Sequence, residues 1–321
     1  MRSQSFSGVT AQFVLKNKNY RKIKIKSKIM NQLSEKKVKL RLENVTYVYG
    51  KGTPYEICAL DNVTENIYSD TVTGIIGHTG SGKSTFVQLL NGLIRPQSGR
   101  VCIDGADIWE KPKEITKIRY RVGLVMQYPE YQLFEETVGT DIAYGPKNMG
   151  LSPLEIEERV NEAASFAGVD DELMKKSPFE LSGGQKRRVA IAGIMAMRPE
   201  VLVLDEPAAG LDPAGRKQIL GGLVDYQRKN HSSVIIVSHS MEDMALYCDD
   251  IIVIANAHPI MHGNSDEIFS REDELIGAGL DVPEVTRLMR TLRQRGFDVP
   301  FGIYTVDKAI SALNGMLQKD R

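Results

Sequence analysis

A nine-residue stretch, "GHTGSGKST" at 77–85, constrains this chain more than any other part of its sequence. It follows the apolar run "TVTGII" and precedes the helical pattern "TFVQLLNGL", which is the strand, loop and helix context that the pattern G-x-x-x-x-G-K-[ST] requires. Glycines let successive backbone N–H groups fold around phosphates, Lys83 adds a positive charge, and the Ser84 hydroxyl can bind Mg²⁺. The sequence therefore predicts a nucleoside triphosphate site. The residues predicted to form it are Gly77, His78, Thr79, Gly80, Ser81, Gly82, Lys83, Ser84 and Thr85.

A second stretch, "VLVLDEP" at 201–207, places two carboxylates at the end of an apolar strand pattern. A phosphate-binding loop needs a carboxylate to complete its metal site, and Asp205 at the strand end would reach Mg²⁺ through water. Glu206, the next residue, can polarise the water that attacks the γ-phosphate. An acidic pair after a strand is by itself more often a polar loop, but the loop at 77–85 in the same chain favours the catalytic interpretation.

The stretch "LSGGQKRR" at 181–188 precedes an apolar helical pattern, "VAIAGIMAM", so Ser182, Gly183 and Gly184 stand where that helix should begin. Unpaired N–H groups and the helix dipole make such a start attractive to an anion, and glycines let a bulky anion approach the backbone. An ordinary serine-capped helix would read the same way. Both interpretations stay open on this stretch alone.

The charges of the chain cancel overall, with 41 basic and 41 acidic residues, but they are unevenly distributed. Residues 1–34 hold eight Lys and Arg and no Asp or Glu, which leaves 33 basic and 41 acidic residues in the remainder. The mildly acidic body argues against nucleic-acid binding. The basic leader could contact RNA or a membrane, or act as an organelle-targeting peptide. We expect instead that 1–36 is a disordered extension, with Met30 as a candidate for the true start.

Two further features restrict the setting of the protein. The sequence holds no apolar run near the 18 or so residues that a membrane helix needs. Its three cysteines, Cys58, Cys102 and Cys248, have neither a metal-binding spacing nor an even number, and they suit a reducing cytosol.

Short β-branched runs alternate with longer helical patterns along most of the chain, which is typical of a largely parallel sheet with crossover helices. Such a sheet binds ligands at the carboxyl ends of its strands. Strands are predicted at 71–77, 122–127, 201–205, 233–239 and 251–255. A helix is predicted at 152–169, a second one at 282–297, and a short strand followed by a helix at 302–317.

Together, these motifs resemble the nucleotide-binding domain of ABC transporters. The resemblance implies that Ser182, Gly183, Gly184 and Gln185 contact the γ-phosphate held by a second subunit. It also implies that Gln127, at the end of "VGLVMQ", senses Mg²⁺ and the attacking water, that "AGLD" at 209–212 is the D-loop, and that His239 holds the γ-phosphate. An aromatic residue after the first strand would stack on adenine; Tyr49 stands at the usual place and Tyr47 is the alternative. The loop at 77–85 does not itself distinguish ATP from GTP.

Finer features are similar to the ATPases of energy-coupling factor (ECF) importers, which are related to cobalt and nickel transport ATPases. They include "QYPEYQLFEETVGTDIAYGPKNMG" at 127–150, "LDEPAAGLDPAGR" at 204–216 and "GAGLDVPEVTRLMRTLRQRG" at 277–296. "GHTGSGKST" with "AAGLDPAGR" looks more like the second of the paired ATPases, often called A2.

That resemblance implies an ATPase, with ATP and Mg²⁺ as cofactors, that energises the uptake of vitamins or metal ions. Its partners would be a second ECF ATPase of the A1 type, a transmembrane T component and substrate-specific S components, with no nucleic acid. These partners would hold it peripherally at the cytoplasmic face of the cell membrane. In the stretch after Gln127, the exposed side chains that receive the T component would be Tyr128, Tyr131, Leu133 and Phe134; packing inside the helical subdomain is the alternative. A homodimeric cobalt or nickel importer ATPase, or a non-transport ABC ATPase, are the competing functions.

The predicted fold class is therefore α/β: a P-loop ABC-type domain with a mixed, largely parallel sheet and a helical subdomain. This domain is expected at 37–270, with the helical subdomain at about 128–195. A small C-terminal α+β domain is expected at 271–321, and dimerisation is one role open to it.

Overall fold

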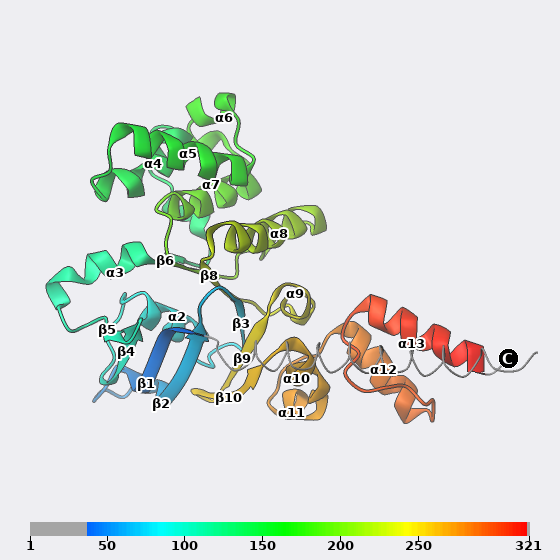
Figure 1. Cartoon of the computed structure of the whole chain (residues 1–321). Coiled ribbons are helices and arrows are strands. Elements are labelled where there is room, and N and C mark those ends of the chain that lie inside the picture. The colour runs from blue at the N-terminus through cyan, green and yellow to red at the C-terminus, as the bar shows by residue number, and fades with distance from the viewer. Residues whose placement is uncertain (1–36, 320–321) are drawn as a thin grey trace, which may run out of the picture. The chain divides into compact units, whose positions relative to one another are not determined.

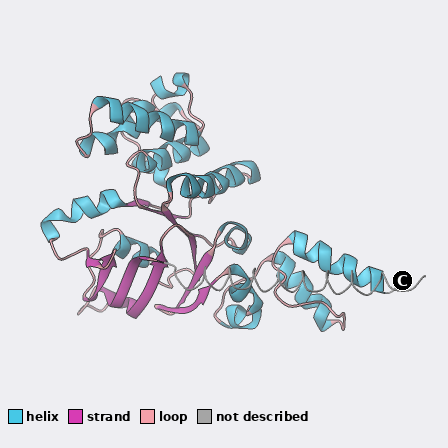
Figure 2. Ribbon diagram, viewed as in Figure 1, coloured by secondary structure: helices cyan, strands magenta, loops and turns pink. Residues whose placement is uncertain are grey.

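The computed structural model describes residues 37–319, so the extension expected over 1–36 lies outside the described residues. Figure 1 shows the arrangement of the elements, and Figure 2 shows the same view by secondary structure. The described strands are β1 (Val38–Tyr49), β2 (Ile57–Tyr68), β3 (Val72–Ile76), β4 (Ser98–Ile103), β5 (Ala106–Asp107), β6 (Val122–Val125), β7 (Val201–Asp205), β8 (Ser233–Val237), β9 (Asp250–Ala255) and β10 (His258–Gly263).

The helices complete the inventory. The α-helices described are α2 (Lys83–Leu90), α3 (Ile115–Arg121), α4 (Val138–Asn148), α5 (Pro153–Ala167), α6 (Asp171–Lys175), α7 (Gly183–Met195), α8 (Pro213–Asn230), α9 (Met241–Tyr247), α10 (Ser265–Ser270), α11 (Glu272–Gly277), α12 (Glu284–Gln294) and α13 (Val306–Lys319). Short 3-10 turns are η1 (Pro112–Glu114), η2 (Pro129–Gln132) and η3 (Pro178–Glu180). Within the described residues, none of the helices combines the length and apolar character needed to cross a bilayer.

The central sheet of the described chain has six strands in the order β10-β9-β3-β8-β7-β6. All neighbours in it pair in parallel except β9 with β10, which is a hairpin. Strands β3, β6, β7, β8 and β9 coincide with the five predicted strands, and their apolar runs are buried as a two-sided parallel sheet requires. A second sheet, in the order β2-β1-β4-β5, pairs β1 with β4 antiparallel. The sheets are therefore mixed, as the sequence predicts.

Two apolar cores cover the two faces of the central sheet, because alternate residues of each strand point to opposite sides. One core holds Ile75 of β3 with Phe86 of α2 and the inner residues of the antiparallel sheet. The other holds Ile76 of β3 with residues of α7, α8, α9 and α10. Packing on both faces fixes the strands, and therefore fixes the loops that leave their carboxyl ends.

Helices α4 to α7 form a subdomain with an apolar core of its own, which includes Val138, Ile142 and Val189. Figure 1 shows these helices grouped together and apart from the strands. The chain enters the subdomain after β6 and returns to the sheet through β7. Helix α5 matches the helix predicted at 152–169, and it begins at a capping box formed by Ser152 and Glu155.

The C-terminal part differs from the prediction in one respect. Among residues 271–319 the structure contains helices α11, α12 and α13 and no strand, so the short strand predicted before the helix within 302–317 is wrong, and these described residues are helical where an α+β domain was expected. Gly302 has a φ of 71°, which breaks an extended backbone, and the Ile303 side chain packs against α12 and α13 in a small core with Met289 and Ala309. The residues are apolar because they fill this core, not because they pair with a neighbouring strand.

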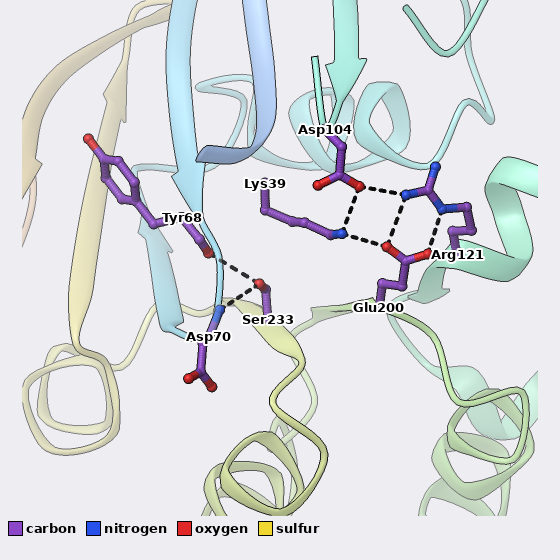
Figure 3. A network of polar contacts seen from close by, with 7 residues as sticks. All are labelled: Lys39, Tyr68, Asp70, Asp104, Arg121, Glu200 and Ser233. Atoms are coloured by element: carbon purple, nitrogen blue, oxygen red, sulfur yellow. Dashed lines mark hydrogen bonds and ion pairs between the residues drawn. The ribbon is translucent and has the colours of Figure 1, made fainter. Parts of the chain in front are cut away.

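A network of charges joins the two sheets at the amino ends of the parallel strands (Figure 3). Lys39 of β1 donates to Asp104 at 2.9 Å and also pairs with Glu200, which directly precedes β7. Arg121, the last residue of α3, contacts both Asp104 and Glu200 at 2.6 Å. Each cation meets two carboxylates and each carboxylate meets two cations, so the network fastens the antiparallel sheet to the strands beside it.

Candidate functional site

The loop between β3 and α2 has a backbone that only glycine permits at key positions. Gly82, which precedes α2, has a φ of 108°, and a Cβ there would collide with the carbonyl oxygen of Ala59. A Cβ on Gly77 would collide with the carbonyl oxygen of Ile254. Thr79 and Gly80 are exposed, whereas the Ser81 hydroxyl is buried and has no hydrogen-bond partner among the described residues. The backbone of the loop is thus packed on its inner side and open to solvent on the other.

Lys83 and Ser84 begin α2 and bring their side chains to different parts of the site. The Lys83 ammonium donates to the carbonyl oxygens of Gly77 at 2.8 Å and His78 at 3.0 Å, so it lies inside the curve of the loop. The Ser84 hydroxyl donates to Oδ2 of Asp205 at 3.0 Å. The structure therefore brings together two of the three residues predicted as metal ligands, Ser84 and Asp205, although they are far apart in the chain.

The donor set at this contact fits Mg²⁺. Hydroxyl and carboxylate oxygens are the ligands that Mg²⁺ prefers, and it usually takes only one or two of them from the protein, with waters and substrate phosphates completing the shell. No cluster of three or more His, Cys, Asp or Glu suited to a metal occurs in residues 37–319. With one hydroxyl and one carboxylate, the contact between Ser84 and Asp205 suits a metal whose other ligands are phosphates and waters.

Glu206 follows Asp205 in a strained backbone conformation, with a φ of 53°. Its N–H donates to the carbonyl oxygen of Val237 at the end of β8, at 3.0 Å, which holds the residue in place. A left-handed backbone is strained for a residue with a side chain, but nine other non-glycine residues of the described chain also adopt one, so the role of Glu206 rests on its contacts. Oε1 of Glu206 is buried and lies 3.4 Å from Nε2 of His239, outside the geometry of a normal hydrogen bond. Two of the three residues predicted as catalytic, Glu206 and His239, therefore face each other across the carboxyl ends of β7 and β8.

The charged groups of this site are partly buried, and their hydrogen bonds and charged neighbours do not fully offset the loss of hydration. Burial, followed by the charge of Asp205, raises the pKa of Glu206 to about 6. Burial also raises the pKa of Asp205 and lowers that of Lys83. The pKa of His239 is lowered by burial and by the positive charge of Lys83. A carboxylate with a pKa near 6 can accept a proton efficiently at neutral pH.

Gln127 lies two residues beyond β6, at the same sheet edge as Asp205, because β6 and β7 are parallel neighbours. Its side chain is exposed and makes no hydrogen bond to Ser84, Asp205 or Glu206 in the described part of the chain. The structure thus places Gln127 at the right edge and does not join it to the other predicted site residues.

The two candidate adenine partners differ in burial. Tyr49 is 41% exposed, and its hydroxyl lies 3.2 Å from that of Thr85 at the start of α2. Tyr47 is packed against the core beneath the antiparallel sheet and meets Tyr49 edge to face, with ring centroids 4.8 Å apart. A base can stack only on an exposed ring face, so the arrangement favours Tyr49.

The start of α7 satisfies both interpretations of "LSGGQ". Ser182 and Gln185 form a capping box, in which the Ser182 hydroxyl accepts from the Gln185 N–H and Oε1 of Gln185 accepts from the Ser182 N–H at 2.9 Å. A Cβ on Gly183 would meet nothing within 4 Å. Figure 1 shows α7 among α4 to α6, away from the loop that precedes α2. The helix start is therefore capped by Ser182, open at Gly183, and away from this chain's own loop, while anion binding there stays a prediction.

An exposed aromatic patch follows Gln127 and consists of Tyr128, Tyr131, Phe134 and Tyr144. Their exposed fractions lie between 44% and 84%. Leu133, which we expected to be exposed with them, is only 6% exposed and packs in the core of the helical subdomain. Tyr144 of α4 was not predicted: it meets Phe134 edge to face at 4.8 Å, and its helical spacing alone gave no sign of this contact. A cavity of about 270 Å³ opens beside these two rings.

Comparison with known proteins gives consistent results. The family described as "ABC transporter" matches residues 60–209. The energy-coupling factor transporter ATP-binding protein EcfA2 of Clostridium acetobutylicum is 52% identical over 271 residues, which cover 84% of this chain and 95% of that protein. The solved structure of cbiO1 from Clostridium perfringens, described as part of the ABC transporter complex cbiONQ, has 39% identity and a TM-score of 0.68, and the match covers 80% of this chain and 100% of that one.

A second solved structure is similar over a smaller part of the chain. It is the dimeric post-hydrolysis state of the ATP-binding cassette MJ0796 bound to ADP and Pi, with 29% identity and a TM-score of 0.64. The match covers 70% of this chain and 98% of that one.

Proposed function

The chain belongs to the ABC transporter ATPases, as a member of the energy-coupling factor transporter ATP-binding proteins, and from this membership we propose that it hydrolyses ATP at a dimer interface to drive uptake of vitamins or metal ions through separate membrane components. One observation carries the proposal. Ser84, Asp205 and Glu206 meet at the carboxyl ends of β3 and β7, where the ligands of parallel sheets bind, and Glu206 is poised as a base.

Each residue of the site has a distinct role in this proposal. Lys83 and the N–H groups of the loop bind the β- and γ-phosphates, and Tyr49 stacks on adenine. Ser84 and Asp205, with Gln127, would hold Mg²⁺, which supplies charge neutralisation at the phosphates when bound. Glu206 accepts a proton from the attacking water, and His239, whose lowered pKa keeps it neutral at pH 7, donates a hydrogen bond to the γ-phosphate.

The open start of α7 would complete the ATP site of a second ATPase chain. A bulky cation at this position should block the partner's phosphate and leave this chain's own loop untouched. We therefore expect Ser182→Arg to preserve the ATP affinity of the isolated chain, because Lys83, Ser84 and Asp205 are unchanged, and to abolish ATP-dependent closure at the opposite site. Nucleotide titration of the chain and ATPase assays of the dimer measure the two effects. Lost affinity in the isolated chain would show that α7 serves its own loop.

The aromatic patch suits the transmembrane T component as its occupant. Tyr131 is 84% exposed and Phe134 57%; Tyr131 lies beside Tyr128 and Phe134 beside Tyr144, and exposed apolar groups gathered in this way are typical of binding surfaces. The cavity beside Phe134 and Tyr144 would receive an apolar side chain of a short helix. Docking here would hold the chain peripherally at the cytoplasmic face of the cell membrane, where the T component shares its ATPases among substrate-specific S components.

The C-terminal helices offer a further contact between the two ATPases. Leu288 of α12, Phe301, and Val306 and Ile310 of α13 are each more than half exposed. A second chain would bury this apolar surface. We assign residues 271–321 a role in dimerisation on this ground.

A homodimeric metal-importer ATPase is the second candidate; the 39% identity to cbiO1, part of the complex cbiONQ, is lower than the 52% identity to EcfA2. Purification of the tagged chain from native membranes, followed by identification of the proteins that accompany it, separates the two functions. A different ATPase of the A1 type beside T and S components would support the first proposal. Only copies of this chain beside membrane proteins would support the homodimer.

The expectation that the basic leader at 1–34 does not bind nucleic acid needs its own test. Binding of RNA and DNA should be compared for the full chain and for a chain that starts at Met30, at low and physiological salt. We expect weak binding that is lost with salt. Tight, salt-resistant binding that depends on residues 1–30 would support the nucleic-acid function instead.

A further inference from the structure

One arginine is almost completely buried where three segments of the chain meet. Arg187, four residues into α7, has a side chain that is 5% exposed. Its Nε and Nη2 donate to the two carboxylate oxygens of Glu130, at 3.1 and 2.9 Å. Its Nη1 donates to the carbonyl oxygen of Ala209. One guanidinium thus joins α7, the turn η2 and the loop at 209–212.

Two of these segments belong to different proposed sites: η2 to the docking patch, and the loop at 209–212 to the site of hydrolysis. Glu130 belongs to η2 and lies in the chain between Tyr128 and Tyr131, and Arg187 also lies 6.0 Å from the centroid of the Tyr128 ring. Ala209 follows the catalytic strand, and its N–H donates to the carbonyl oxygen of Glu206 at 3.2 Å. The Arg187 side chain therefore contacts both η2, which carries part of the aromatic patch, and the turn that follows Glu206.

The chemistry of this contact makes it stiff. The planar fork of an arginine holds both oxygens of a carboxylate through two parallel hydrogen bonds, and the point charge of a lysine does not reproduce that fixed geometry. A buried charge that loses its partner is strongly destabilised, so the guanidinium must follow Glu130 or leave it altogether. A displacement of η2 accordingly reaches Ala209 through the same group.

We propose that Arg187 is the positioning residue through which a protein docked on the aromatic patch changes the setting of the 209–212 loop and of Glu206. The proposal rests on the docking of a membrane component proposed above. It adds the residue that links this docking to hydrolysis. A residue that only stabilised the helical subdomain would have the same burial, so the test must measure the link itself.

The quantity to measure is the partner effect, defined as the ratio of ATP turnover by the purified complex in lipid vesicles to turnover by this chain in its ATPase dimer, freed of the membrane components. We expect the wild-type ratio to differ from one by about fivefold or more, since coupling between sites typically reaches that size. Arg187→Lys should bring the ratio to within about twofold of one. Turnover by the freed chain should stay within about threefold of wild type, because Lys83, Asp205 and Glu206 keep their contacts.

Arg188→Lys is the matched control. Arg188 is the next residue of the same helix and donates to the carbonyl oxygen of Ala167 inside the helical subdomain, at 2.9 Å, so it tests general damage to α7. This variant should keep the wild-type ratio. Glu130→Gln, which retains the shape but loses the charge of the partner, should shift the ratio toward one by itself. The double variant should have the same ratio as Arg187→Lys alone, because both substitutions remove the same contact between Arg187 and Glu130.

The outcomes separate this inference from the proposed function. A wild-type ratio of one would refute coupling at the patch, and with it the docking on which the inference rests. A wild-type ratio well away from one that Arg187→Lys leaves unchanged would refute the role of Arg187 alone. If Arg187→Lys does not assemble, Glu130→Gln decides: a ratio shifted toward one supports the link, and an unchanged ratio overturns it.

Discussion

The two ends of strand β7 carry glutamates with opposite properties. Glu200 precedes the strand and is paired with Lys39 and Arg121, and these contacts lower its pKa to about 2 despite partial burial (Figure 3). Glu206 follows the strand, and burial beside Asp205 raises its pKa to about 6. The residue type and the strand are the same, so the difference in pKa comes from how far charged partners offset the effect of burial on each carboxylate. At the amino end every charge is paired, whereas at the carboxyl end the charges are desolvated and incompletely paired.

This difference separates a structural cluster from a reactive one. Paired ions hold two sheets together and have no capacity left for another ligand. Buried charged groups without full pairing interact strongly with the charge of an added ligand. Perturbed pKa values are therefore common at functional sites. The following predictions test whether the two ends of β7 divide in this way.

The largest effect is expected at the carboxyl end. Glu206→Gln should keep ATP binding and slow turnover by about 10²-fold or more, because the amide cannot accept the proton of the attacking water. It should also hold the dimer closed around unhydrolysed ATP. Steady-state hydrolysis, nucleotide titration and dimer sizing measure these effects. Glu200→Gln is the matched control on the same strand and should leave turnover within about twofold. Normal hydrolysis by the Glu206→Gln complex would show that another group is the base.

Lysine substitutions extend the comparison to the cations. Lys83→Ala should weaken ATP binding by about tenfold or more, since a hydrogen bond to a charged group contributes about 1.5–3 kcal/mol. Lys39→Ala removes the same charge from the network at the other end and should leave ATP affinity unchanged while lowering the melting temperature. Titration with a fluorescent ATP analogue distinguishes them. Equal losses of affinity would mean that the two ends are not functionally separate.

The pH dependence of turnover should report the raised pKa of Glu206. A base acts when ionised, so turnover at saturating ATP should rise with pH through about 6 and level off above about 7. Between pH 4.5 and 6 the folded state binds more protons at Glu206 than the unfolded state, so this group lowers the stability as pH rises through that range. A pH–rate profile from 5 to 8 is the measurement. A rate independent of pH over this range would contradict a base with this pKa.

The sequence predicted the carboxyl end of β7 far better than the amino end. Lys83, Ser84, Asp205 and Glu206 belong to short motifs whose backbone and chemistry are local, and their strands read as continuous apolar runs. The network at the amino end joins four residues from separate elements, and no local pattern marks them. Leu133 was misplaced for a similar reason, because the burial of one apolar residue within an exposed segment depends on helices elsewhere in the chain.

The smallest effect is expected for the network itself. Glu200→Gln should lower stability by about 1 kcal/mol, because its side chain is 42% exposed and ion pairs at such positions are screened by water. The melting temperature should fall by about 2–4 °C, with turnover unchanged. The pKa of Glu200 is depressed, so its contribution is fully present above pH 4.5 and is lost as pH falls toward 2. The difference in melting temperature between wild type and variant should therefore be constant from pH 8 to pH 5. A difference that disappeared near pH 6 would mean that Glu200 titrates like Glu206, and that pairing does not distinguish the two ends of the strand.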